Sequence, residues 1–281
     1  MPDASGHDYP FLKGHGTHND FVLLPDHEGT VHGDLDPSRV RALCDRRGGI
    51  GGDGVLRVVR AAADSAAEWF MDYRNADGSV SEMCGNGIRV FGRHLVQEGL
   101  ADPTRPLPVD TRDGIKTITF AGGAVDGEIT VDMGVPRLLG ESKIGVADGD
   151  DVRWWSAAHV DTGNPHAVAF LDDLAEAGPL TSAPEHDAEV YPNGVNVEFV
   201  VRRGEHHVAM RVHERGSGET QSCGTGACAV AVAAASADGA ERGTPYRVDL
   251  PGGTLTITWR PDGRVLMAGP ALIVARGSTR L

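Results

Sequence analysis

The stretches Cys84-Gly-Asn-Gly87 and Cys223-Gly-Thr-Gly226 share one Cys-Gly-x-Gly pattern and lie 139 residues apart. Each stretch opens an apolar segment. Ile88–Gln97 carries apolar residues at helical spacing, and Ala227–Ala235 is small and apolar on all sides. A helix that is apolar all round is a buried helix. The pattern therefore predicts two buried helices, each beginning at a cysteine.

The repetition extends upstream of both cysteines. A polar turn begins nine residues before each of them, at Asn75 in the first half and at Glu214 in the second. Asn19 and Asn164 lie farther upstream, each in a polar segment that contains glycine. We interpret the halves as two copies of one unit, with the seam near residues 122–127.

Short strand-like runs separated by glycine turns accompany the two helices. Strands beside a single core helix predict an α+β class. We expect an N-terminal half over residues 1–124 and a C-terminal half over residues 125–269. The sequence leaves open whether a last strand, near 270–281, pairs back with the first half. A further helix is expected at Pro37–Cys44, because proline suits the first helical position. The expected strands are Phe21–Leu24, Val55–Val59, Trp69–Tyr73, Lys116–Ala121, Ile129–Met133, His166–Leu171, Val195–Val201, His207–Val212, Thr254–Trp259 and Leu266–Ala271.

Composition narrows the class of protein. The 281 residues include 26 Lys and Arg against 40 Asp and Glu, a net charge of −14, which argues against a nucleic-acid partner. No apolar run reaches the ~18 residues of a membrane span. Met1–Lys13 lacks the basic start and apolar core of a signal peptide. Four cysteines are too few for a disulfide scaffold, so we expect a reducing, cytoplasmic location.

A cysteine at a helix start has a definite chemistry. The first helical N–H groups carry partial positive charge, which lowers the pKa of a thiol there. Glycines next to it let a carboxylate approach those N–H groups closely. Two such thiols on opposite faces of one carbon acid would suit a racemase, in which one thiol removes a proton and the other returns it. The same pattern would also fit a redox pair, or two buried cysteines that cap core helices.

Other motifs are weaker. Gly49-Ile-Gly-Gly-Asp-Gly54 matches a dinucleotide loop, but a helix precedes it and a strand follows, so we interpret it as a structural turn. The 12 histidines show no metal-site spacing, and no metal is expected. Cys44 and Cys228 are expected to be ordinary buried cysteines.

Four motifs together resemble the diaminopimelate epimerase family: Arg74-Asn-Ala-Asp-Gly-Ser, Met83-Cys-Gly-Asn-Gly, Gly163-Asn-Pro-His and Glu214-Arg-Gly-Ser-Gly-Glu-Thr-Gln-Ser-Cys-Gly-Thr-Gly-Ala. The resemblance runs from about His15 to Leu281. It implies an isomerase without a cofactor that interconverts LL- and meso-diaminopimelate for lysine and peptidoglycan precursor synthesis. It also implies two pseudo-symmetric domains, each a strand barrel around a central helix, and a homodimer.

The resemblance assigns roles to individual residues. Cys84 and Cys223 match the acid/base pair, and His166 and Glu214 match positions that tune the thiol pKa values. The N–H groups of Gly85, Asn86, Gly224 and Thr225 match those that hold the reacting carboxylate. The remaining substrate contacts match Asn19, Asn75, Asn164, Asn196, Glu214 and Arg215.

Two positions depart from the family pattern. His18 stands where the family often has glycine, and Gly54 stands where many members have glutamine. Relatives that act on proline or hydroxyproline typically have histidine after the first Cys-Gly, where this chain has Asn86. These departures leave a different amino-acid substrate open. Rival functions are a thiol redox protein, a noncatalytic amino-acid-binding protein and a phenazine-synthesis-type isomerase, although the last of these lacks the paired cysteines.

Overall fold

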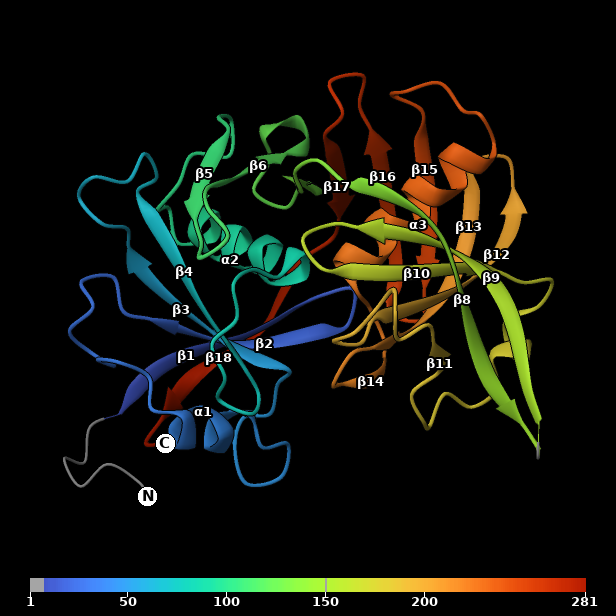
Figure 1. Ribbon diagram of the computed structural model, residues 1–281. Helices are drawn as coiled ribbons and strands as arrows, with labels where there is room; N and C mark the ends of the chain where they lie inside the picture. Colours follow the sequence, from blue (N-terminus) through green and yellow to red (C-terminus); the bar gives the residue numbers. More distant parts are fainter. Residues whose placement is uncertain (1–7, 150) are drawn as a thin grey trace. The chain divides into compact units, whose positions relative to one another are not determined.

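The computed structural model describes residues 8–149 and 151–281. Residues 1–7, where the expected N-terminal half and the segment assessed for a signal peptide begin, lie outside the described residues. The chain forms two compact units (Figure 1). Unit 1 contains the chain up to Val131 together with Gly269–Leu281, and unit 2 contains Asp132–Ala268. Residues 125–131, expected in the C-terminal half, belong to unit 1.

Unit 1 is built on one sheet with the strand order β18-β1-β2-β3-β4-β5-β6-β7. Neighbouring strands are antiparallel except for β2–β3 and β4–β5, which are parallel. The strands are β1 (Tyr9–Gly16), β2 (Asn19–Pro25), β3 (Gly54–Arg60), β4 (Trp69–Asn75), β5 (Leu107–Asp110), β6 (Lys116–Phe120), β7 (Ile129–Asp132) and β18 (Leu272–Thr279). Helix α2 (Gly85–Gln97) packs against β1, β2, β3, β4 and β18, and α1 (Pro37–Cys44) packs on β3. A short 3-10 turn, η1, spans Ala121–Gly123.

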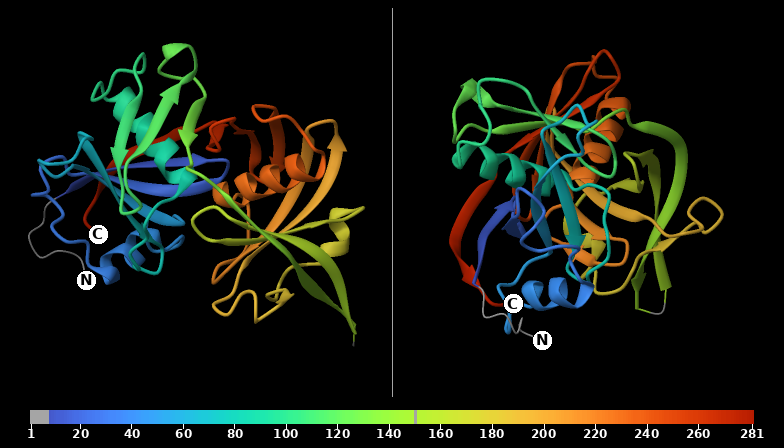
Figure 2. Two further views of the ribbon diagram at one scale, coloured as in Figure 1. Left: turned by 45° about the horizontal axis from the view of Figure 1, so that its top comes forward. Right: turned by 90° about the vertical axis from the view of Figure 1, so that its left-hand side faces the viewer.

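Unit 2 has the order β8-β9-β10-β12-β13-β15-β16-β17, with β11 paired to β8 and β14 to β13. The parallel pairs are β10–β12 and β13–β15. Helix α3 (Gly224–Ala237) packs against β9, β10, β12, β13, β15 and β16 (Figure 2). The strands are β8 (Arg137–Asp148), β9 (Asp151–Asp161), β10 (Pro165–Phe170), β11 (Glu185–His186), β12 (Asn196–Gly204), β13 (His207–Glu214), β14 (Gly218–Thr220), β15 (Pro245–Leu250), β16 (Gly253–Trp259) and β17 (Val265–Gly269), and the 3-10 turn η2 spans Leu174–Ala177.

The two strand orders repeat the same sequence of parallel and antiparallel pairings. The buried helix follows β4 in unit 1 and the β13–β14 hairpin in unit 2. The expected α+β class and the pseudo-symmetry are thus confirmed. β18 pairs with β1 from Tyr9↔Thr279 to His15↔Leu272, in the position that β8 occupies beside β9. The C-terminal strand therefore does return to the first half.

The expected elements are present, with ends that differ by up to three residues. α3 is buried on all sides up to its last turn, as its alanine-rich sequence predicts. α2 also buries Arg89, Arg93 and His94, which the apolar spacing did not indicate. The guanidinium of Arg89 donates to Gly85 O at 3.2 Å, and that of Arg93 donates to Ala271 O at 3.0 Å. Backbone carbonyl groups thus accept from these buried cations.

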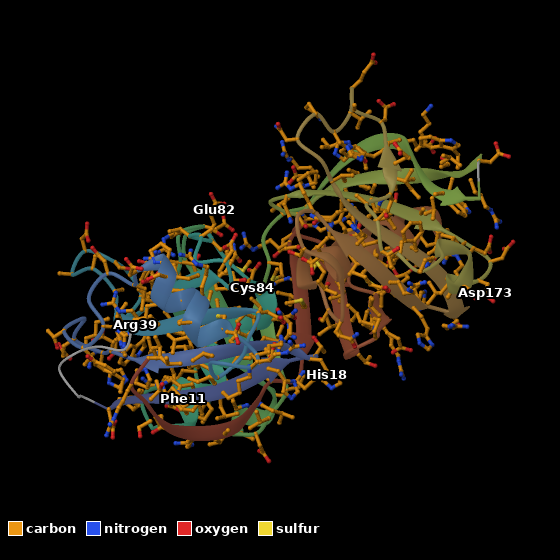
Figure 3. The ribbon with its side chains drawn as sticks, turned by 90° about the horizontal axis from the view of Figure 1, so that it is seen from below. Phe11, His18, Arg39, Glu82, Cys84 and Asp173 are labelled. Carbon is orange, nitrogen blue, oxygen red and sulfur yellow. The ribbon has the colours of Figure 1, made fainter. Side chains whose placement is uncertain are left out.

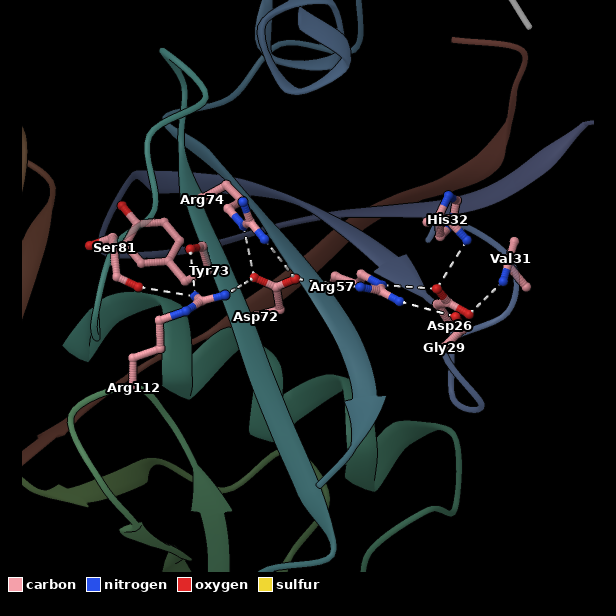
Figure 4. A network of polar contacts seen from close by, with 10 residues as sticks. All are labelled: Asp26, Gly29, Val31, His32, Arg57, Asp72, Tyr73, Arg74, Ser81 and Arg112. Carbon is pink, nitrogen blue, oxygen red and sulfur yellow. Dashed lines mark hydrogen bonds and ion pairs between the residues drawn. The ribbon is translucent and has the colours of Figure 1, made fainter. Parts of the chain in front are cut away.

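A network of ionic contacts ties the strands of unit 1 together (Figure 4). Asp72 on β4 accepts from Arg74 at 2.9 Å and from Arg112 at 2.5 Å, and Arg57 lies 3.6 Å away. Arg57 also pairs with buried Asp26 at 2.9 Å. Burial alone would raise the pKa of Asp72, but hydrogen bonds from Arg74 and Arg112 outweigh it, and the pKa lies below its usual value. Asp72 is therefore a carboxylate at neutral pH.

Replacing Asp72 with Asn should destabilise the protein by about 3 kcal/mol at pH 7, because the three arginines lose their shared counter-charge. A pKa lowered on folding gives stability that is fully present above about pH 4 and is lost as pH falls through the folded-state pKa. The difference between wild type and variant in urea unfolding should therefore shrink below pH 4. Glu68→Gln, which breaks an exposed pair with Arg60, is the control and should change stability much less. An equally small effect of Asp72→Asn at pH 7 would contradict this role.

Candidate active site

In unit 1 the expected site residues lie at one edge of the sheet. Asn19 begins β2, Gly54 begins β3 and Asn75 ends β4. The parallel β2–β3 register pairs Phe21 with Gly54, and the antiparallel β3–β4 register pairs Gly54 with Asn75. These strand ends are therefore neighbours.

Cys84 is the N-cap of α2 (Figure 3). Its sulfur accepts from Gly87 N at 3.4 Å, and its thiol donates to Asn19 Oδ1 at 3.6 Å. Asn86 Nδ2 donates to the same Asn19 oxygen at 3.2 Å, and Arg89 holds the other end of the Asn86 amide at 2.9 Å. Three of the expected residues thus form one hydrogen-bonded group at the start of the helix.

Asp53 orients Asn19, and the sequence did not identify it. Asp53 Oδ2 accepts from Asn19 Nδ2 at 2.8 Å and from Asp20 N at 3.1 Å, while Arg46 holds Oδ1 at 2.7 Å. The Asn19 amide nitrogen therefore turns to Asp53 and its oxygen to Cys84. The only signal in the sequence was the position of Asp53 beside Gly54.

Asn75 lies at the same edge, but its side chain is engaged in its own turn. Asn75 Nδ2 donates to Ser79 Oγ at 3.0 Å. The Arg112 guanidinium donates to the carbonyl groups of Tyr73 and Ser81, each at 3.2 Å, and so fixes both ends of this turn (Figure 4).

The two departures from the family pattern have local explanations. A Cβ on Gly54 would lie 2.6 Å from Arg74 O and 2.7 Å from Tyr73 Cε2, so this backbone leaves no room for a side chain. His18 is exposed at the tip of the β1–β2 hairpin with φ 64°, a conformation that glycine adopts readily. Its ring packs on His15, with centroids 5.4 Å apart.

Unit 2 repeats this edge with different side chains. His166 lies at the start of β10 and pairs in parallel register with Asn196, the first residue of β12. Glu214 ends the antiparallel strand β13, and Arg215 follows it. Asn196 Nδ2 donates to Pro165 O at 3.1 Å, and Asn196 Oδ1 accepts from Arg215 N at 3.0 Å.

The Glu214 and Arg215 side chains complete this edge. Thr220 Oγ1 donates to Glu214 Oε1, which holds the carboxyl group against the β14 strand. Arg215 is exposed, and its guanidinium donates to Asn193 O at 3.2 Å.

Cys223 is the N-cap of α3 and is 5% exposed. Its sulfur accepts from Gly226 N at 3.4 Å and lies 3.5 Å from Thr225 Oγ1. Burial, and then the carboxyl groups of Glu214 and Glu198, raise the pKa of this thiol well above its usual value. The expectation of a lowered pKa is therefore wrong for Cys223, because desolvation outweighs the helix N-terminus. Cys223 is a protonated thiol in this state.

Beside Cys223 lies a buried polar pair that includes a residue the sequence did not single out. His166 Nδ1 and Glu198 Oε1 are 2.6 Å apart, and both side chains are fully buried. His166 Nε2 lies 2.9 Å from Asn164 Oδ1. Glu198 lies among apolar residues of β12, and its neighbours along the chain do not indicate this contact.

Both helix starts suit an anionic ligand. Gly85 and Asn86 open α2, and Gly224 and Thr225 open α3. Backbone N–H groups at these positions point along the helix axis and bind carboxylates. Among residues 8–149 and 151–281, no cluster of three His, Cys, Asp or Glu is arranged to hold a metal ion, and no helix has the length and hydropathy to cross a membrane.

Comparison with known structures agrees with this fold. A Bacillus anthracis phenazine biosynthesis protein of the PhzF family matches with TM-score 0.71 and 16% identity, over 97% of this chain and 99% of that one. A hydroxyproline epimerase from Agrobacterium vitis matches with TM-score 0.69 and 16% identity, over 98% and 93%. The repeated units, each with a helix that begins at a cysteine, thus have the fold that these proteins share.

Comparison of the amino-acid sequence with known proteins identifies the family of this chain. The family model for diaminopimelate epimerase matches residues 11–139 and 158–274. The diaminopimelate epimerase of Streptomyces coelicolor is 59% identical, covering 95% of this chain and 94% of the relative. That of Rhodococcus opacus is 45% identical, covering 95% and 96%. The chain belongs to the diaminopimelate epimerase family.

The two site cysteines should differ in reactivity toward an alkylating reagent. Cys84 is half-buried, whereas Cys223 is buried with a raised pKa, and only the thiolate reacts. Iodoacetamide at pH 8 should therefore modify Cys84 faster than Cys223 by about tenfold or more, as measured by peptide mass spectrometry. In urea, where both cysteines are solvated, the two rates should converge. Equal rates in the folded protein would contradict the burial and charge assigned to Cys223.

Proposed function

We propose that this chain converts LL-2,6-diaminopimelate to meso-diaminopimelate by a two-cysteine acid/base mechanism, without a cofactor. The observation that carries the proposal is the cysteine N-cap of each buried helix, in a chain of this family. The reaction belongs to lysine and peptidoglycan precursor biosynthesis.

Substrate recognition follows from the polar edges. The N–H groups of Gly85, Asn86, Gly224 and Thr225 bind the carboxylate next to the reacting carbon. The amides of Asn19, Asn75, Asn164 and Asn196, with the Glu214 carboxylate and the Arg215 guanidinium, bind the other amino and carboxylate groups. An arginine suits this task because its planar fork makes two parallel hydrogen bonds to a carboxylate.

The chemical step is one proton removal and one proton delivery. A Cys84 thiolate takes the α-proton, and the electrons of the broken C–H bond move into the carboxylate, where helix N–H groups stabilise the developing charge. The Cys223 thiol gives its proton to the opposite face and forms the new C–H bond. The raised pKa of Cys223 supports this starting assignment. The reverse direction exchanges the two roles.

The decisive experiment is turnover of LL-diaminopimelate in deuterated water without added cofactor. Deuterium should enter the α-position as the meso isomer forms, followed by NMR and mass spectrometry. Cys84→Ala and Cys223→Ala should each lower the epimerisation rate by about 10²–10⁴-fold, because each removes an acid/base group. Cys44→Ala is the control: Cys44 lies in the apolar core of unit 1, and burial raises its pKa to about 11. No exchange by the reduced wild-type protein would assign the chain to another amino acid.

We further propose that the enzyme is a cytoplasmic homodimer. A reducing compartment keeps both thiols available for proton transfer. Leu272 and Val274 on β18 are 54% and 57% exposed, apolar surface that a second copy would cover. Light scattering should then give about twice the chain mass of 29.6 kDa. A monomer at micromolar concentration would refute the dimer.

A further inference from the structure

The internal repeat offers a comparison of the two cysteine sites within one chain. Gly87 and Gly226 are the third residues of α2 and α3. A Cβ on Gly87 would lie 3.3 Å from Leu56 Cδ2 and 3.5 Å from Phe21 Cζ. A Cβ on Gly226 would lie 2.6 Å from Glu198 Oε1. The first turn of α2 thus lies against apolar side chains. The corresponding turn of α3 lies against the carboxyl group of Glu198.

Strand register makes the correspondence specific. β2 pairs with β3 as β10 pairs with β12, and the Phe21↔Gly54 pair matches His166↔Asn196. Two residues farther along the second strand lie Leu56 and Glu198. Phe21 and Leu56 in unit 1 therefore occupy the places of His166 and Glu198 in unit 2. Because an apolar pair fills this place in one copy, the fold itself does not require the ionisable pair.

The two hydrogen bonds of the His166 ring show how many hydrogens the His166–Glu198 pair carries. An amide oxygen carries none, so the 2.9 Å contact with Asn164 Oδ1 requires a hydrogen on His166 Nε2. The 2.6 Å contact between His166 Nδ1 and Glu198 Oε1 requires a second hydrogen. The pair is therefore neutral overall, as complete burial favours.

The hydrogen shared by the pair belongs to Glu198. Burial raises the pKa of Glu198, and its Oε2 atom is buried without a hydrogen-bond partner. A neutral carboxylic acid tolerates such an orphaned oxygen better than a carboxylate does. Glu198 thus donates its hydrogen to Nδ1, and the neutral imidazole keeps its own hydrogen on Nε2.

We propose that Glu198 is a positioning residue that acts through His166 to fix the orientation of the Asn164 amide, whose nitrogen then presents both hydrogens to the bound amino acid. The inference rests on the proposed function, in which Asn164 binds substrate. Asn164 is partly exposed, whereas His166 and Glu198 are fully buried. The buried pair therefore does not contact substrate itself and acts only through its hydrogen bond to Asn164.

Glu198 could instead act as a charge on the nearby Cys223 thiol, and the groups around it show what that role would require. Besides His166, the groups that share its electrostatic environment are Glu214 on β13, Cys223 at the start of α3 and Tyr191 before β12. A carboxylate at Glu198 would be a second negative charge beside Cys223 and would act on that thiol directly. A protonated Glu198 acts on Asn164 instead.

Two substitutions separate these roles. Glu198→Gln offers an amide hydrogen to Nδ1 in place of the acid hydrogen, so KM should stay within about threefold of wild type and the pH profile of kcat/KM should not move. Glu198→Leu places a leucine where unit 1 has Leu56, so the variant should fold. It removes the hydrogen bond that Glu198 makes to His166 Nδ1. It should raise KM about tenfold, as expected for one misaligned hydrogen bond, with a smaller change in kcat.

Val200→Ala is the matched control, because Val200 is fully buried two residues along the same face of β12. It should lower the unfolding temperature without changing KM. If Glu198→Leu and Val200→Ala behave alike, Glu198 is only structural and the proposal is overturned. If Glu198→Gln shifts the pH profile of kcat/KM to lower pH, Glu198 acts as a charge on Cys223, and the proposal is again overturned.

A measurement that does not require catalysis tests the positioning role of Glu198 independently of the proposed epimerase activity. Imidazole ¹⁵N NMR, with His166 assigned by its loss in His166→Phe, should show a hydrogen on Nε2 that exchanges slowly in wild type and Glu198→Gln. Exchange should be faster in Glu198→Leu. A wild-type Nε2 without a hydrogen would overturn the proposal even if Glu198→Leu fails to fold. This signature in a protein that does not epimerise diaminopimelate would refute the proposed function and leave the positioning geometry intact.

Discussion

The structure depends on a sulfur atom that caps each buried helix. Cys84 accepts the N–H of Gly87, and Cys223 accepts that of Gly226, each at 3.4 Å. In unit 1 the capped helix start lies at the sheet edge that carries the polar strand ends, where the Cys84 thiol donates to Asn19. The parallel pairs β2–β3 and β10–β12 create that edge in each unit, because they bring two strand starts side by side. In the proposed mechanism, the sulfur atom that caps the helix is also the acid/base group.

The two copies of the unit differ in the groups that surround this atom. The Cys84 thiol donates to an amide oxygen, that of Asn19, which Asp53 orients from behind. Burial, and after it the carboxyl groups of Glu214 and Glu198, raise the pKa of Cys223. The repeated unit therefore surrounds its two thiols with different polar groups. In the proposed mechanism one cysteine accepts a proton while the other donates one, and the raised pKa of Cys223 fits the donor.

The sequence predicted the features that depend only on residues close together in the chain. The cysteine-headed helices, the hydrophobic strands and the polar turns were predictable because periodicity and glycine placement determine them. Glu198 and Asp53 were not predictable, since their importance comes from strand register and from a partner far away in the chain. The pKa of Cys223 was predicted in the wrong direction because the sequence shows the helix N-terminus, but not how fully the thiol itself is buried or that Glu198 lies near it. The long hairpin of β8 and β9 was missed because most of its residues are exposed and its few buried ones, such as Ala157 and Val160, do not alternate regularly with them.

The return of β18 to β1 also constrains the order in which the chain can fold during synthesis. Unit 2 is continuous in the chain, so it can close as soon as Ala268 has left the ribosome. Most of unit 1 is synthesised before unit 2, yet its sheet keeps an open edge beside β1 until β18 has emerged. An exposed strand edge is a template for pairing with other chains. The sheet of unit 1 can therefore be completed only after β18 has been synthesised, and loss of β18 should affect the first half of the enzyme rather than the second.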